Sequence, residues 1–224
     1  MSSFFSEQAA ASYLDGPPRQ VPGYAGLLRM TSLLLAEQAP ADARILVLGA
    51  GGGMEIKVLA DDQPHWLFDG VDPSGPMLRL AAETVGGHAA RVRLHEGYVD
   101  TAPDGPFGAA TCILIFHFMT RDQRLDALRQ LRRRLKPGAP FVLAHISFPQ
   151  AEPERSLWIA RHVAFGAAAG LTSEQTESAR KAIGEKLTIL APTEEESLLR
   201  EAGFVDITQF YAAFSFRGWV AYAA

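Results

Sequence analysis

The sequence predicts an α/β fold in which a sheet of seven mostly parallel strands carries helices on both faces and a helical insertion after the fifth strand. Five short apolar runs alternate with segments of helical periodicity. Strands that are apolar on both faces are typical of a parallel sheet buried between helices. In addition, a run of glycines follows the first apolar run directly, as at the first turn from strand to helix in such sheets.

The individual elements follow from this alternation. The expected strands are the apolar runs at 44–49, 66–72, 91–97, 110–116, 140–146, 205–211 and 218–223. Helical spacing of apolar residues predicts helices at 73–85 and 121–135. A further helix is expected at 193–203, with a cap at Thr193, a glutamate three positions on and a stop at Gly203. Residues 151–190 contain two helical segments with no strand between them, which predicts the insertion.

Composition limits the class of protein. The chain of 224 residues is 48% hydrophobic, enough for a full core, and we expect one domain with an N-terminal helical lid at 1–40 and a helical cap at 151–190. A net charge of -4 offers no overall positive field to nucleic acid or to an anionic membrane. The single cysteine, Cys112, lies in an apolar run and is expected to be a buried thiol in a reducing compartment. With no leader-like N-terminus and no apolar run of about 20 residues, we expect a soluble cytoplasmic protein.

The stretch "ILVLGAGGGMEI" at 45–56 contains the strongest functional signal. Glycine lets the backbone turn sharply and approach a ligand closely, and the following helix offers its N-terminus to polar groups. A tight turn alone would explain one or two glycines but not the four present, which are Gly49, Gly51, Gly52 and Gly53. The dinucleotide fingerprint would require a third glycine where Met54 stands, which disfavours a nicotinamide oxidoreductase.

The spacing of Gly49, Gly51 and Gly53 resembles instead the first motif of class I S-adenosylmethionine-dependent methyltransferases, which have a Rossmann-like fold. Asp72, at the end of the second strand in "GVDPSGPML", can accept hydrogen bonds from both ribose hydroxyls of a nucleoside, or can cap the next helix. The stretches "LRRRLKPGAPFVL" and "LLREAGFVDI" are similar to later motifs of the same superfamily.

A narrower resemblance is to the carboxy-S-adenosylmethionine synthases, a branch that acts in modifying the tRNA wobble uridine. It lies in "RQVPGYAGLLRM", in the helical insertion and in the ending "YAAFSFRGWVAYA". The resemblance implies that Tyr24 is a lid residue over the methionine end of the cofactor; a core or surface aromatic is the alternative. Leu198 stands where this branch has the arginine that anchors the extra carboxylate, and Arg200 lies about 200° around the helix from it. Ordinary S-adenosylmethionine is therefore the expected cofactor.

Two acidic positions of the branch are also altered here. Val47 replaces the acid of the first strand, and Tyr98 replaces the aspartate that would meet the adenine amine. We expect adenine to be held by stacking and by the Val99 amide. With S-adenosylmethionine as cofactor and S-adenosylhomocysteine as product, the resemblance implies the cofactor-binding residues Tyr24, Gly49, Ala50, Gly51, Gly53, Asp72, Pro73, Tyr98, Val99 and Ile115.

Methyl transfer from a sulfonium is a direct displacement, so a base is needed only for an acceptor that carries a proton. His117 and His145 follow the fourth and fifth strands at the edge where ligands bind, and are the candidate catalytic residues; a structural histidine is the alternative for each. No metal site is expected, because the six histidines show no short ligand spacing. The arginine run 132–134 is expected to be a solvated helix face rather than an RNA site.

These observations predict a methyltransferase that acts on a small-molecule or otherwise unidentified acceptor. The alternatives are a carboxy-S-adenosylmethionine synthase and a non-catalytic nucleoside-binding module. The helical segment 151–190 either roofs the acceptor pocket or forms a homodimer contact.

Overall fold

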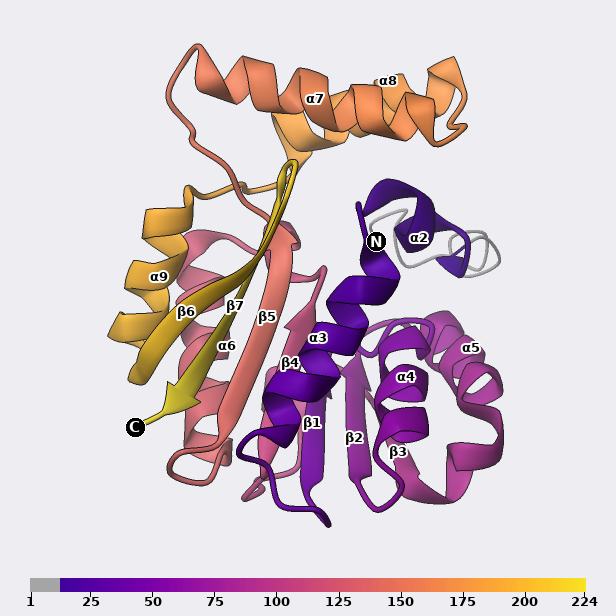
Figure 1. Ribbon diagram of the computed structural model, residues 1–224, viewed down its shortest axis with the longest axis vertical. Helices are drawn as coiled ribbons and strands as arrows, with labels where there is room; N and C mark the ends of the chain where they lie inside the picture. Colours follow the sequence, from indigo (N-terminus) through magenta and orange to yellow (C-terminus); the bar gives the residue numbers. More distant parts are fainter. Residues whose placement is uncertain (1–12) are drawn as a thin grey trace.

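The computed structural model describes residues 13–224, which form one seven-stranded sheet in the order β3-β2-β1-β4-β5-β7-β6 (Figure 1). All neighbouring strands are parallel except β7, which runs antiparallel to both β5 and β6. The strands are β1 (Arg44–Leu48), β2 (Leu67–Asp72), β3 (Val92–Glu96), β4 (Ala109–Ile113), β5 (Pro140–Ile146), β6 (Phe204–Ala213) and β7 (Phe216–Ala223). The predicted mostly parallel α/β sheet is therefore confirmed.

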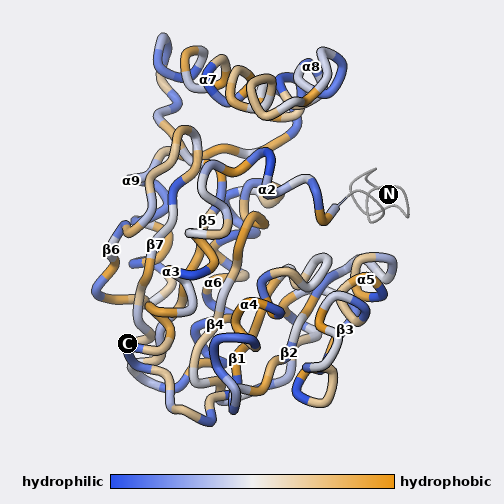
Figure 2. The backbone as a smooth tube through the Cα atoms, turned by 45° about the vertical axis from the view of Figure 1, so that its right-hand side comes forward, coloured by the Kyte–Doolittle hydropathy of each residue, from blue (hydrophilic) through white to orange (hydrophobic). Residues whose placement is uncertain are grey.

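Helices cover both faces of the sheet. The helices are α2 (Gly16–Gln20), α3 (Tyr24–Ala36), α4 (Met54–Asp62), α5 (Gly75–Val85), α6 (Arg121–Arg134), α7 (Glu154–Ala168), α8 (Ser173–Lys181) and α9 (Pro192–Glu201). The face under α3, α4 and α5 buries one hydrophobic cluster, and the face under α6 and α9 buries a second. Figure 2 shows the apolar strands between these more polar helices. This pattern explains why the sequence of the central strands is apolar at nearly every position.

The parallel register brings the ends of β1 and β2 to one edge of the sheet. Leu48 pairs with Val71, so the glycine loop after β1 and Asp72 at the end of β2 emerge side by side. The segment of α7 and α8 stands over the same edge (Figure 1). None of the helices described in residues 13–224 combines the length and the apolar character that crossing a membrane requires.

Three details differ from the sequence prediction. The fourth strand ends at Ile113 rather than at 116, because Leu114 takes a left-handed conformation (φ 63°) and a short 3-10 turn, Phe116–Phe118, follows. Helix α9 begins at Pro192, one residue before Thr193, and its N-terminus is capped by the Glu194 side chain, which accepts the Ala191 N–H.

The third difference concerns the arginine run 132–134. Only Arg133 is exposed. Arg132 donates to the carbonyl oxygens of Gly203 and Ala224, and the buried Arg134 donates to several carbonyl oxygens of the segment before β4. Two of the three arginines therefore donate to backbone carbonyl groups, and the expectation of a solvated face is wrong for the buried Arg134.

Candidate functional site

The glycine loop joins β1 to α4 with a backbone that only glycine adopts easily. Gly49, Gly51 and Gly53 have φ values of 79°, 49° and 80°. Its first two N–H groups, those of Gly49 and Ala50, both donate to the carbonyl oxygen of Val71, at 2.8 and 3.0 Å. The loop is thus fixed to the end of β2, and its remaining backbone faces the carboxyl edge of the sheet.

Asp72 holds the loop to the neighbouring turn. Its Oδ2 accepts the Gly51 N–H and its Oδ1 accepts the Ser74 N–H, each at 2.9 Å. Burial raises the pKa of Asp72, and these two N–H groups lower it in part. The cap of helix α5 is Ser74, whose hydroxyl accepts the Met77 N–H, so Asp72 is not the cap itself. A carboxylate has about four lone-pair positions, so two remain for a ligand.

Neighbouring atoms lie close to the positions where three of the loop glycines would carry a Cβ. A Cβ on Gly49 would lie 2.1 Å from Ile115, and one on Gly53 would lie 2.9 Å from the Ala81 backbone. A Cβ on Gly51 would lie 2.8 Å from the hydroxyl of Tyr13. The sequence predicted Ile115 as a residue of this site but did not predict Tyr13, because a contact between residues 38 positions apart does not appear in local sequence periodicity.

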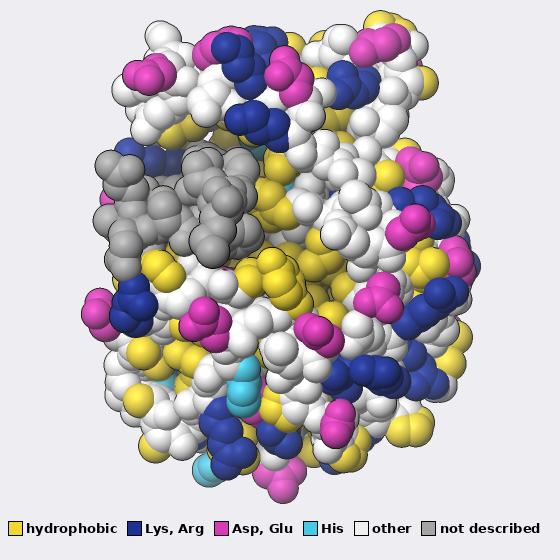
Figure 3. All heavy atoms as spheres, turned by 180° about the vertical axis from the view of Figure 1, so that it is seen from behind, with side chains coloured by type: hydrophobic (Ala, Val, Ile, Leu, Met, Phe, Trp, Pro, Cys, Tyr) yellow, Lys and Arg dark blue, Asp and Glu magenta, His cyan; other side chains and the backbone are white. Residues whose placement is uncertain are grey.

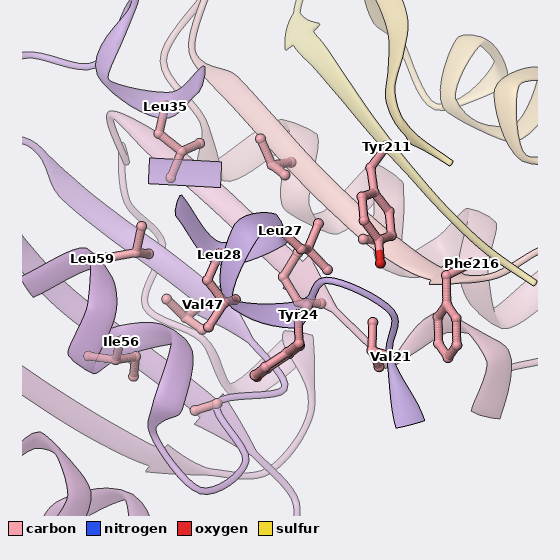
Figure 4. Close-up of a cluster of buried hydrophobic side chains, with 14 of the residues drawn as sticks. Val21, Tyr24, Leu27, Leu28, Leu35, Val47, Ile56, Leu59, Tyr211 and Phe216 are labelled. Carbon is pink, nitrogen blue, oxygen red and sulfur yellow. The ribbon is translucent and has the colours of Figure 1, made fainter. Parts of the chain in front are cut away.

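Tyr24 is the first residue of α3 and is 8% exposed. It lies in the hydrophobic cluster that also contains Leu27, Leu28 and Val47 (Figure 4). Burial, followed by the proximity of Tyr13, raises the pKa of its hydroxyl. The structure thus brings Tyr24 next to the aromatic side chain on the glycine loop, and its role as a lid residue stays a prediction.

The residues expected around adenine lie beside Asp72. The Gly97 N–H donates to the Asp72 carbonyl oxygen at 3.1 Å, which sets the turn containing Tyr98 and Val99 next to the end of β2. Tyr98 is 63% exposed, whereas Val99 is buried. Pro73, between Asp72 and Ser74, is half-buried. The exposed Tyr98 ring is therefore accessible to a planar ligand.

The two candidate catalytic histidines are both buried, in different surroundings. His117, in the 3-10 turn after β4, has an Nδ1 without a hydrogen-bond partner among the described residues, and burial holds its pKa well below the usual range. His145 is fully buried on β5, with Nε2 2.9 Å from Glu195 Oε1, and Glu195 also pairs with Arg124. These surroundings favour the structural alternative for His145, whose catalytic role stays a prediction.

Leu198, which the sequence resemblance leads us to expect at the position of the anchoring arginine, is fully buried on α9 in the second cluster. Arg200 is exposed and pairs with Glu196 at 3.0 Å. Neither side chain contacts the glycine loop in the structure described.

Glu55, the second residue of α4, is a further residue that sequence reasoning passed over. It is 6% exposed, and its Oε1 has no hydrogen-bond partner among the described residues. Its spacing of four from the buried Leu59 places both on the inner face of α4, so the helical pattern contained a signal for it.

Comparison with known proteins supports the interpretation of the loop. Residues 45–138 match the family described as "Methyltransferase domain". The chain is 27% identical to a carboxy-S-adenosyl-L-methionine synthase of Chromohalobacter salexigens, over 97% of this chain and 82% of that protein. It is 24% identical to the synthase of the same name from Aeromonas salmonicida, over 97% and 90%.

Solved structures share the fold at lower sequence identity. An O-methyltransferase family protein from Burkholderia thailandensis superposes with a TM-score of 0.69 at 13% identity, over 99% of this chain and 64% of that chain. Human N-acetylserotonin methyltransferase in complex with S-adenosylmethionine gives 0.67 at 15% identity, over 99% and 57%. The chain thus spans less than two thirds of each solved protein. The domain match, the strand order and the glycine loop together identify a class I S-adenosylmethionine-dependent methyltransferase domain in this chain, of a family of enzymes whose cofactor is S-adenosylmethionine.

Proposed function

We propose that this protein transfers a methyl group from S-adenosylmethionine to a small-molecule acceptor and releases S-adenosylhomocysteine. The observation that carries the proposal is the loop of left-handed glycines tied to Asp72 at the carboxyl edge of the sheet. A loop without side chains lets the cofactor approach the backbone closely, and Asp72 keeps lone pairs for the ribose hydroxyls. The residues present fit the cofactor of the family.

When bound, the cofactor supplies an electrophilic methyl group on a sulfonium, which an acceptor lone pair displaces directly. The residues of this chain act by alignment. The glycine loop and Asp72 orient the nucleoside, Tyr98 and Val99 flank the adenine, and Tyr13 with Tyr24 cover the loop against water. For an acceptor that carries a proton, His117 is the candidate base, because it is neutral at pH 7 and its Nδ1 has no hydrogen-bond partner among the described residues.

The segment of α7 and α8 serves, in this proposal, as the roof of the acceptor site, and a dimer contact remains the alternative. It stands over the carboxyl edge of the strands, and Figure 3 shows hydrophobic side chains in a recess below it. An apolar recess beside the reactive edge suits a small organic acceptor rather than a polyanion.

Calorimetric titration with S-adenosylhomocysteine tests the cofactor site. We expect Asp72→Asn to weaken binding by about 1.5–3 kcal/mol, because hydrogen bonds to a charged acceptor are lost. Gly51→Ala should also weaken binding, since its Cβ enters the loop. Gly138→Ala is the matched control, because Gly138 is also left-handed (φ 74°) but has no neighbour within 4 Å of its Cβ position. Unchanged affinity in both site variants would overturn the assignment.

The second candidate function is that of a carboxy-S-adenosylmethionine synthase, favoured by the names of relatives that align over 97% of this chain. Competition binding of S-adenosylmethionine and its carboxylated form to the wild-type protein separates the two. We expect no preference for the carboxylated ligand, because Leu198 offers no cation. A clear preference for it would favour the second candidate, and tight binding without turnover across an acceptor library would favour a silent nucleoside-binding module.

A further inference from the structure

Glu55 is an exception among the buried acids of this protein. The other three buried carboxylates described are compensated: Asp69 and Glu195 each pair with an arginine and a histidine, and Asp72 accepts two backbone N–H groups. Glu55 forms no ion pair among the described residues, and its Oε1 is unpartnered. A buried carboxyl without a partner costs free energy, so the protein retains Glu55 at a cost to its stability.

The position of Glu55 is the second observation. It lies in the first turn of α4, immediately after the glycine loop, and next to Thr111 of β4. The Thr111 hydroxyl is close enough to lower the pKa of Glu55, although the two groups do not form a hydrogen bond of normal geometry. Glu55 also lies close enough to the phenols of Tyr13 and Tyr24 to raise their pKa values. Since Tyr13 covers Gly51, this carboxyl lies beside the covered side of the loop.

The strand order gives the direction of a ligand across this loop. Asp72 ends β2 on one side of β1, and Thr111 belongs to β4 on the other side. In the proposed function the adenine lies beside Tyr98 and Val99, after β3, so a nucleoside whose ribose binds Asp72 extends its sulfur substituent in the other direction, over the loop toward β4. In S-adenosylmethionine, that substituent ends in an α-amino acid, which carries an ammonium group.

We propose that Glu55 binds the α-ammonium group at the methionine end of the cofactor, a role that rests on the proposed function. Val47 of β1 pairs in register with Thr111 of β4, so the residue of β1 beside this site is apolar. The negative charge at this site comes instead from Glu55 on α4. The ammonium group gives Glu55 the charged partner that it does not have among the described residues. Glu55 thereby selects ligands with an amino-acid tail over nucleosides without one.

The protonation state of Glu55 gives this pair a measurable signature. Burial raises the pKa of Glu55 to about 7, with the Thr111 hydroxyl opposing the shift in part. Among residues 13–224 the titratable groups near it are Tyr13, Tyr24 and Cys112, and burial raises the pKa of each, so they stay neutral through this range. An ammonium favours the carboxylate, so binding below about pH 7 should release a proton.

The test compares two ligands by calorimetry. S-adenosylhomocysteine carries the amino-acid tail, whereas 5′-methylthioadenosine keeps the nucleoside and the thioether without it. We expect Glu55→Gln to weaken binding of S-adenosylhomocysteine by roughly tenfold or more, and to leave binding of 5′-methylthioadenosine within about twofold. Glu83→Gln, which changes an exposed glutamate on α5, is the matched control and should affect neither ligand.

Proton release on ligand binding distinguishes a direct contact between Glu55 and the ammonium group from a purely structural role of Glu55. Titration at about pH 6 in two buffers of different ionisation enthalpy should show protons released by the wild type with S-adenosylhomocysteine, and fewer released by Glu55→Gln. Equal weakening of both ligands, or identical proton release in the two proteins, would overturn the role of Glu55 while leaving the proposed function intact. Failure of the wild type to bind either ligand would overturn the proposed function and this inference with it.

Discussion

Replacing Glu55 by glutamine should stabilise the protein at alkaline pH and do little at acid pH. The folded protein holds the pKa of Glu55 at about 7, against 4.5 for the exposed group. The folded state therefore binds a proton more tightly than the unfolded chain, and stability falls as pH rises from about 4.5 to 7. Each tenfold change in proton affinity is worth about 1.4 kcal/mol, so the full loss is about 3 kcal/mol.

Urea unfolding of the wild type and of Glu55→Gln at about pH 5 and pH 8 measures this effect. Subtracting the unfolding free energies of the two proteins at each pH cancels the contribution of all other titrating groups. We expect the variant to gain about 2–3 kcal/mol relative to the wild type between the two pH values, and Glu83→Gln to gain nothing. A difference between variant and wild type that is the same at both pH values would show that Glu55 is not a buried group of raised pKa.

Two further predictions concern stability, both measured by urea unfolding. Gly53→Ala should cost about 2 kcal/mol or more, because alanine is strained at φ 80° and its Cβ would lie 2.9 Å from Ala81; a cost below about 0.5 kcal/mol would contradict this. Arg124→Leu should cost about 3–5 kcal/mol because it leaves Glu195 buried without its main cation, whereas the double variant with Glu195→Leu should recover much of the loss. Equal stability of single and double variants would argue against that pair.

The sheet could be predicted from the sequence because its signals are local. Apolar runs and the glycines that follow them depend on a few adjacent residues, and each of the seven strands lies within a few residues of its expected place. The end of β4 could not be predicted, since Leu114 is a leucine held at positive φ by its surroundings. The start of α9 shifted because Pro192 fits the first turn of a helix and Glu194 provides the cap.

The candidate site also contains parts that the sequence could predict and parts that it could not. The glycine loop and Asp72 form a short motif, and the structure brings them together. Tyr13 contacts the loop from a distant part of the chain, and the partners of Glu195 lie on α6 and β5. Local residue spacing therefore cannot predict these contacts. His145 lies near the end of β5, where the sequence predicts a ligand, but α9 packs against the sheet there and buries this side chain.

The attachment of the segment between β5 and α9 has a consequence for how this protein changes over evolutionary time. A hydrogen bond joins the two ends of this segment: the Ser147 hydroxyl donates to the Leu190 carbonyl oxygen at 2.9 Å. The residues between these two points leave and rejoin the sheet at one place. Changes in the length or sequence of this segment therefore leave the strand order, the glycine loop and Asp72 in place, and in its proposed role as the roof of the acceptor site such changes would alter acceptor preference alone.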